Sequence, residues 1–170
     1  MRAIMARVRL SLLTWPRGRD WLELAGAAIV FAICGAAIGF STHLLHFSPR
    51  NAGEVVRIAA IAFLAPALAE ELIFRGAMIP AQGEGRSAFF WIFVSTVLFT
   101  LWHIVETSFL PGGAAFFKRF DFLALAALLG LLCGVLRYRS GSIWTAVFLH
   151  WLVAVAWIGW FGGPSLRELR

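Results

Sequence analysis

The chain has 170 residues, of which 61% are hydrophobic and only 14% charged, and its formal net charge is +6. Soluble domains are typically about 45–50% apolar and about 25% charged, so this composition excludes a soluble globular protein and indicates an integral membrane protein. The positive charge favours anionic lipid headgroups over nucleic acid as a partner, because a cluster of basic residues lies directly ahead of the first apolar segment (Arg2, Arg7, Arg9, Arg17 and Arg19).

Five apolar segments are long enough to be spanning helices, and breaks rich in Pro, Gly or Arg separate them. In chain order they cover about residues 21–47, 55–79, 88–109, 120–136 and 143–161. The connections are short, so consecutive helices are expected to be antiparallel neighbours. We therefore predict an all-α integral membrane protein: one bundle of about five transmembrane helices that forms a single domain over residues 1–170, with residues 1–20 as a basic juxtamembrane segment.

Basic residues in the loops predict the orientation, because cytoplasmic loops are enriched in Lys and Arg. With the N-terminus inside, the inner segments add Arg86, Arg137 and Arg139 to the N-terminal cluster, and the outer segments carry Arg50, Lys118, Arg119, Arg167 and Arg170. The prediction is a multi-pass protein of the cell membrane with a cytoplasmic N-terminus. The run over residues 24–45 is too long for a signal-peptide core and no cleavage site follows it, so we interpret it as a retained span.

Glu70 and Glu71 lie side by side within the second apolar segment, with Arg75 four residues after Glu71. A carboxylate at membrane depth costs about 2.5–3.5 kcal/mol on insertion scales, so an adjacent pair indicates a function. Glu71 and Arg75 share a helix face and are expected to form a structural ion pair. Glu70 points about 100° away from Glu71 and has no cation on its own helix, which makes it the candidate general base.

His103 and His150 stand inside the third and fifth apolar segments. From the helical rise, Glu70, His103 and His150 lie roughly 15, 24 and 12 Å from the loops on one side, which are compatible depths. A water between Glu70 and His103 would have a general base, and His150 could donate a hydrogen bond to an oxyanion. A single intramembrane histidine is more often an interhelical hydrogen-bonding residue, but the set as a whole favours hydrolysis of a peptide bond without a covalent intermediate.

Other polar and reactive residues have simpler interpretations. Cys34 and Cys133 lack a CxxC partner or metal-ligand spacing and are interpreted as small buried hydrophobes. His43 and His46 are predicted to be interfacial, and Glu106, near a helix end, to be solvated. The abundant Trp and Phe side chains are predicted to face lipid and the membrane interface for the most part.

Together these residues resemble the CPBP family of glutamic intramembrane proteases, which includes CAAX prenyl endopeptidases and bacteriocin-processing or immunity-associated membrane proteins. The resemblance covers about residues 55–155 and rests on three motifs in the family's order. They are EExxxR (Glu70, Glu71, Arg75), FxxxH (Phe99, His103) and a late histidine after a Gly-Ser-aliphatic-Trp start (Gly141 to Trp144, His150).

The resemblance implies an endopeptidase that needs no metal or other cofactor. Glu70 would activate water with His103, Glu71 and Arg75 would hold the site, and His150 would stabilise the oxyanion. The substrate would be a membrane-anchored protein or peptide, cut near its terminus within the lipid bilayer. The small size resembles family members that process C-terminal sorting signals.

One position departs from the family pattern. The family commonly has Asn or Asp four residues after the last histidine, and that position is Ala154 here. In the family this side chain is thought to help the histidine form the oxyanion hole, and loss of one such donor can cost about 10²–10³ in rate. Ala154 therefore favours one alternative, a non-catalytic immunity or partner-binding membrane protein.

Two further alternatives come from the same residues. Carboxylates and imidazoles are also good zinc ligands, so a metal-dependent membrane hydrolase is an alternative, although the HExxH motif is absent. A proton-coupled carrier is disfavoured, because the five segments show no repeat symmetry.

Overall fold

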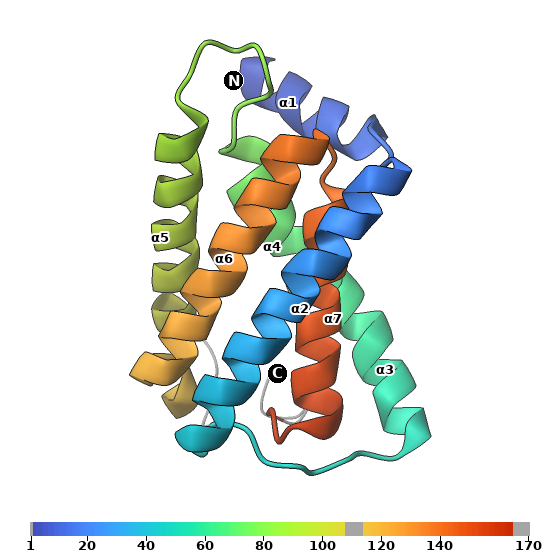
Figure 1. Ribbon diagram of the computed structural model, residues 1–170, viewed down its shortest axis with the longest axis vertical. Coiled ribbons are helices and arrows are strands. Elements are labelled where there is room, and N and C mark those ends of the chain that lie inside the picture. The colour runs from blue at the N-terminus through green and yellow to red at the C-terminus, as the bar shows by residue number, and fades with distance from the viewer. Residues whose placement is uncertain (1, 108–113, 165–170) are drawn as a thin grey trace.

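A computed structural model of the protein describes residues 2–107 and 114–164, and the regular elements in these ranges are helical (Figure 1). The α-helices are α1 (Arg2–Leu13), α2 (Gly18–Ser41), α3 (Ala52–Ala62), α4 (Ala69–Glu71), α5 (Ala88–Glu106), α6 (Phe120–Ser140) and α7 (Trp144–Trp160). Two π-helical turns, η1 (Phe63–Leu68) and η2 (Leu72–Ala77), flank α4, and a 3₁₀ turn, η3 (Ala114–Lys118), precedes α6.

Among the described residues, four helices are long and apolar enough to cross a membrane: α2, the combined run Ala52–Ala77, α5 and α6. The fifth apolar helix, α7, is shorter, with 17 residues. These helices run roughly alongside one another in Figure 1. The prediction of an all-α membrane bundle is confirmed. The helix ends differ from the predicted segments by a few residues, because the chain between α2 and α3 is a non-helical connection.

Helix α6 is the centre of the bundle. Within its apolar window 44% of the residues are buried, against 17–22% in the other three candidate spans. It packs against α5, α2 and α7, and it lies between α2 and α5 in Figure 1. Gly130 and Gly134 on α6 allow close approach, because a Cβ at Gly134 would lie 3.0 Å from the Ile92 side chain of α5. Because α5 and α7 both pack on α6, this packing determines their distance from the second span.

The second span is interrupted just before its acidic residues. Ala65 has an extended backbone (φ −140°, ψ 119°), and Pro66 has no N–H to continue the helical hydrogen bonding. Carbonyl groups on both sides of this break find side-chain donors: Trp151 Nε1 donates to Ala59 O at 2.7 Å, and Ser95 Oγ donates to Phe74 O at 2.7 Å. These two bonds join the second span to α7 through Trp151 and to α5 through Ser95.

The basic N-terminal segment is a helix that lies across one end of the bundle, which the sequence did not predict (Figure 1). Ile143 N donates to Ser11 O at 3.0 Å, and Trp144 Nε1 donates to Leu12 O at 2.9 Å. Arg7 is 6% exposed. Its guanidinium binds the Glu84 carboxylate at 2.6 Å and donates to Ala77 O at 2.6 Å, which caps the end of η2.

Candidate functional site

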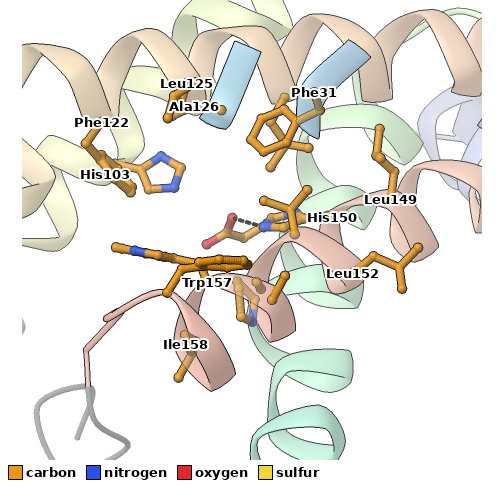
Figure 2. Close-up of a pocket in the computed structure, with 18 of the residues that line it drawn as sticks. Phe31, His103, Phe122, Leu125, Ala126, Leu149, His150, Leu152, Trp157 and Ile158 are labelled. Carbon is orange, nitrogen blue, oxygen red and sulfur yellow. Dashed lines mark ion pairs between the residues drawn. The ribbon is translucent and has the colours of Figure 1, made fainter. Parts of the chain in front are cut away.

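The residues predicted to form the site come together in the middle of the bundle. Glu70 on α4, His103 on α5 and His150 on α7 line one cavity of about 860 Å³. Figure 2 shows the two histidines at this cavity, with a carboxylate beside His150. Glu70, His103 and His150 are only 7%, 8% and 5% exposed. Three elements that are distant in sequence therefore present their ionisable groups to one cavity.

His150 connects the two glutamates. Its Nδ1 lies 2.9 Å from Glu71 Oε1, and its Nε2 lies 3.9 Å from Glu70 Oε2. Because a carboxylate accepts and does not donate, Nδ1 carries a proton that it donates to Glu71. Nε2 then faces Glu70 and the cavity, and it can donate a hydrogen bond when the ring carries both protons.

Arg75 lies behind the cavity wall and is fully buried with Glu71. Arg75 Nε is 3.2 Å from Glu71 Oε2, which is the i,i+4 pair expected from the sequence. The guanidinium carbon lies 4.1 Å from the centre of the Phe99 ring, a cation–π contact in a desolvated place. The absence of a side chain at Gly130 leaves room for this stack, since a Cβ there would lie 3.1 Å from Arg75 Nη2.

His103 is fixed by its own helix and by aromatic neighbours. Its Nδ1 lies 2.9 Å from Phe99 O, so Nδ1–H donates to that carbonyl and a neutral ring has its lone pair on Nε2. The ring packs edge-on against Phe99 at 4.8 Å and Phe122 at 5.3 Å between ring centres. A neutral imidazole with a free lone pair at Nε2 is suited to accept a hydrogen bond from a water.

Two residues of the cavity were not predicted from the sequence as site residues. Trp102 Nε1 donates to Glu70 Oε1 at 3.3 Å. Glu106 also lines the cavity. It ends α5, as the sequence predicted, but it is half-buried at the cavity wall and therefore less solvated than expected. Its spacing from Trp102 and His103 was the available signal, because residues three and four apart share a helix face.

The cavity is not confined to the middle of the bundle. Its lining extends from Glu70 to the end of the bundle opposite α1, where it reaches Phe40, Phe117, Phe161 and Pro164. The end near α1 is closed in part by Arg7 and the residues that it binds.

The lining is largely apolar, and several aromatic side chains belong to it. Phe31, Phe99, Phe122 and Trp157 contribute to the wall, so the expectation that the aromatic residues mostly face lipid was too general. Ala154 also lines the cavity, one helical turn after His150, and supplies no polar group there. The departure from the family pattern therefore lies at the site itself.

The remaining sequence interpretations concern residues outside the cavity. His43 and His46 are exposed, and they line a separate polar pocket of about 450 Å³ at the end of the bundle near the α2–α3 connection. Cys133 is buried and Cys34 is partly buried, and both are free thiols. In the parts of the chain that the structure describes, no cluster of three or more His, Cys, Asp or Glu side chains has the geometry of a metal site.

Comparison with known proteins identifies the family. A family model described as "Type II CAAX prenyl endopeptidase Rce1-like" matches residues 52–156, a range that contains the five predicted site residues (Glu70, Glu71, Arg75, His103 and His150). Comparisons with curated proteins and with solved structures gave no match. Because the family model matches more than half of the chain, the protein belongs to the Rce1-like family of type II CAAX prenyl endopeptidases, which are membrane proteases.

Proposed function

We propose that this protein is an intramembrane endopeptidase that hydrolyses a peptide bond near the terminus of a membrane-anchored protein or peptide. The observation that carries the proposal is the convergence of Glu70, His103 and His150, from three elements, on one largely apolar cavity of about 860 Å³. An extended apolar peptide segment fits such a cavity, and the three ionisable groups supply acid–base chemistry in its wall.

Glu70 acts as the general base. The Trp102 N–H donates to one oxygen of its carboxylate at 3.3 Å and fixes its orientation, which leaves the other oxygen for a water. The free Nε2 of His103 accepts the second hydrogen bond of that water. Glu70 and His103 together hold one water, so that its oxygen lone pair points toward a substrate carbonyl. General base catalysis of this kind contributes about 10²–10⁴ in rate.

His150 stabilises the oxyanion of the tetrahedral intermediate. Its Nδ1–H is bound by Glu71 at 2.9 Å, which orients the ring. When the ring carries both protons, Nε2–H points into the cavity as the donor. Since Ala154 offers no second donor, we expect a slower reaction than a site with two donors would give.

The substrate enters from the end of the bundle opposite α1, because the cavity lining extends in that direction. With a cytoplasmic N-terminus, as the basic residues favour, this entrance is on the outer side of the cell membrane. The lipid bilayer thus holds the anchored part of the substrate beside α2 and α7 while the segment to be cut occupies the cavity.

A cleavage assay in proteoliposomes tests the proposal. Candidate membrane-anchored substrates, with and without a lipid modification, are incubated with the wild-type protein and the Glu70→Gln variant. We expect cleavage by the wild type and none by Glu70→Gln, because the amide keeps the volume but cannot accept a proton from water. Glu54→Gln is the matched control, because Glu54 is an exposed residue of α3. Near-normal cleavage by Glu70→Gln would refute the role of Glu70.

A non-catalytic partner-binding role is the second candidate, and Ala154 at the cavity wall is the observation that favours it. Under that role, Glu70→Gln would still capture the membrane partner and neither form would cut it. Introducing the missing donor with Ala154→Asn separates the two candidates, because faster cleavage by this variant supports the protease.

A metal-dependent hydrolase is the remaining alternative. Addition of a chelator to the same cleavage assay tests it.

A further inference from the structure

A third acidic side chain, Glu106, faces the candidate site from the last turn of α5. It lies three residues after His103 and four after Trp102, so all three project from the same side of the helix into the cavity. The Glu106 carboxyl lines the same cavity as the Glu70 carboxyl, and Trp102, four residues before Glu106, donates its indole N–H to Glu70 at 3.3 Å. Glu106 is half-buried.

Two carboxyl groups that face one largely apolar cavity are most stable with a proton on one of them, because two adjacent carboxylates repel each other. The described residues that line this cavity include no Lys or Arg that could neutralise a second negative charge. The other charged or titratable groups around the pair are Glu71 and Arg75 from behind, His103 from α5 and His150 from α7. Glu71 and Arg75 neutralise each other, and a His150 that carries both ring protons offsets one carboxylate of the pair, which leaves the other carboxyl group to hold a proton.

The proposed reaction needs a proton donor for the leaving amine, and the histidines do not supply it. A neutral His103 has its proton on Nδ1, where it is donated to Phe99 O, so its Nε2 has none to give. His150 donates Nδ1–H to Glu71, and its Nε2–H is assigned to the oxyanion. Of the described residues at the cavity, Glu106 is the remaining carboxyl group that could carry the proton.

We propose that Glu106 is a second catalytic carboxyl group, which donates the proton to the leaving amine while Glu70 accepts the proton of the water. This inference rests on the proposed protease function. As the water oxygen bonds to the substrate carbonyl carbon, its proton passes to Glu70 and the C=O electron pair moves to oxygen. As the C=O bond re-forms and the C–N bond breaks, Glu106 gives its proton to nitrogen.

The cycle closes without another reactant. After cleavage Glu70 is protonated and Glu106 is ionised. The proton returns from Glu70 to Glu106 within the cavity that both carboxyl groups line, and the site is ready for the next water. The products are a new carboxyl terminus and a new amino terminus. A shared proton between two carboxyl groups has the same use in aspartic proteases.

The test compares Glu106→Gln, Glu106→Asp and the control Glu54→Gln in the proteoliposome cleavage assay. We expect Glu106→Gln to lower kcat by about 10²-fold or more with little change in KM. The amide keeps the size and polarity of the carboxyl group but cannot transfer a proton. Its pH profile of kcat/KM should lose the fall at high pH that the wild type shows when the acid ionises. Glu106→Asp should recover part of the rate and restore this fall.

A measurement without substrate complements the assay. The infrared C=O stretch of a protonated carboxyl group should be present in the wild type at neutral pH and absent in Glu106→Gln, while Glu54→Gln retains it. Thermal unfolding shows whether the variant is folded.

The results separate the two proposals. If Glu70→Gln cuts normally, the proposed function fails. If Glu70→Gln is inactive while Glu106→Gln keeps the rate and pH profile of Glu54→Gln, only the role of Glu106 is overturned. A variant that raises KM alone, or that leaves the infrared band in place, also overturns it.

Discussion

Glu71 binds two partners at once, Arg75 on its own helix and His150 on α7. One oxygen of its carboxylate lies 2.9 Å from His150 Nδ1 and the other 3.2 Å from Arg75 Nε. Glu70, its neighbour in sequence, makes only a longer contact with His150 and a hydrogen bond with Trp102. Two adjacent glutamates therefore have different tasks: Glu71 positions the site and Glu70 faces the cavity.

We expect Glu71→Gln to lower thermal stability by far more than Glu70→Gln. The substitution leaves Arg75 as a buried charge without its partner, and breaking a buried pair costs about 3–5 kcal/mol. The additional variant Glu71→Gln with Arg75→Gln should recover part of this loss, because no charge is then unpaired. Thermal unfolding in detergent measures all four proteins. Equal unfolding temperatures for the two single glutamine variants would contradict the division of tasks.

The sequence predicted Glu70, Glu71, Arg75, His103 and His150 as site residues because ionisable groups are rare in apolar segments and each is easy to notice. The contact between Glu71 and Arg75 follows from helical spacing alone. Trp102 and Glu106 were missed, because their positions relative to Glu70 depend on how α5 is rotated against α4. The Glu71–His150 bond was missed for the same reason, since it joins residues 79 positions apart.

Among the elements, α1 and the interrupted second span deviate most from the sequence-based prediction. Pro66 indicated a kink, but only the structure shows that the helix resumes at once and places Glu70 in its first turn. Contacts of Arg7, Ser11 and Leu12 with distant parts of the chain hold helix α1 in place. Such long-range contacts leave no periodic signal in a basic N-terminal segment.

The ion pair between Arg7 of α1 and Glu84 contributes to the stability of the fold, and this contribution depends on pH. Hydrogen bonding to the Arg7 guanidinium lowers the pKa of Glu84 below its ordinary value of 4.5. A carboxyl group with a lowered folded-state pKa contributes stability above its unfolded pKa and loses it as the pH falls through the folded value. We expect Glu84→Gln to unfold at a lower temperature than the wild type at pH 7, and this difference to disappear in acid.

Arg7→Ala serves as the matched comparison. It removes the salt bridge and also the hydrogen bond to the Ala77 carbonyl at the end of η2, which does not depend on pH. Its loss of stability should therefore persist at acid pH, where that of Glu84→Gln has vanished. Thermal unfolding of the two variants and the wild type at neutral and acid pH measures both effects. A pH-independent deficit in Glu84→Gln would show that the ion pair is not the cause.

At the scale of the whole molecule, the two ends of the bundle differ in chemistry. One end carries α1, the α4–α5 connection and the α6–α7 turn, and the other carries the α2–α3 connection (Figure 1). The cavity lining reaches this second end. An even number of crossings separates the N-terminus from Gln82, so both lie on one side of the membrane, and Pro49 lies on the other. The orientation decides from which side a substrate reaches Glu70.

The last prediction is that Pro49 is outside the cell membrane and Gln82 is inside. Both residues are exposed, so a cysteine at either position can react with a maleimide. In a background with Cys34 and Cys133 replaced by Ala, a membrane-impermeant maleimide should label Pro49→Cys in intact cells. It should label Gln82→Cys only after the membrane is opened, because basic residues keep that end in the cytoplasm. The background without cysteines is the control, and labelling of Gln82→Cys alone in intact cells would reverse the orientation and place the cavity entrance in the cytoplasm.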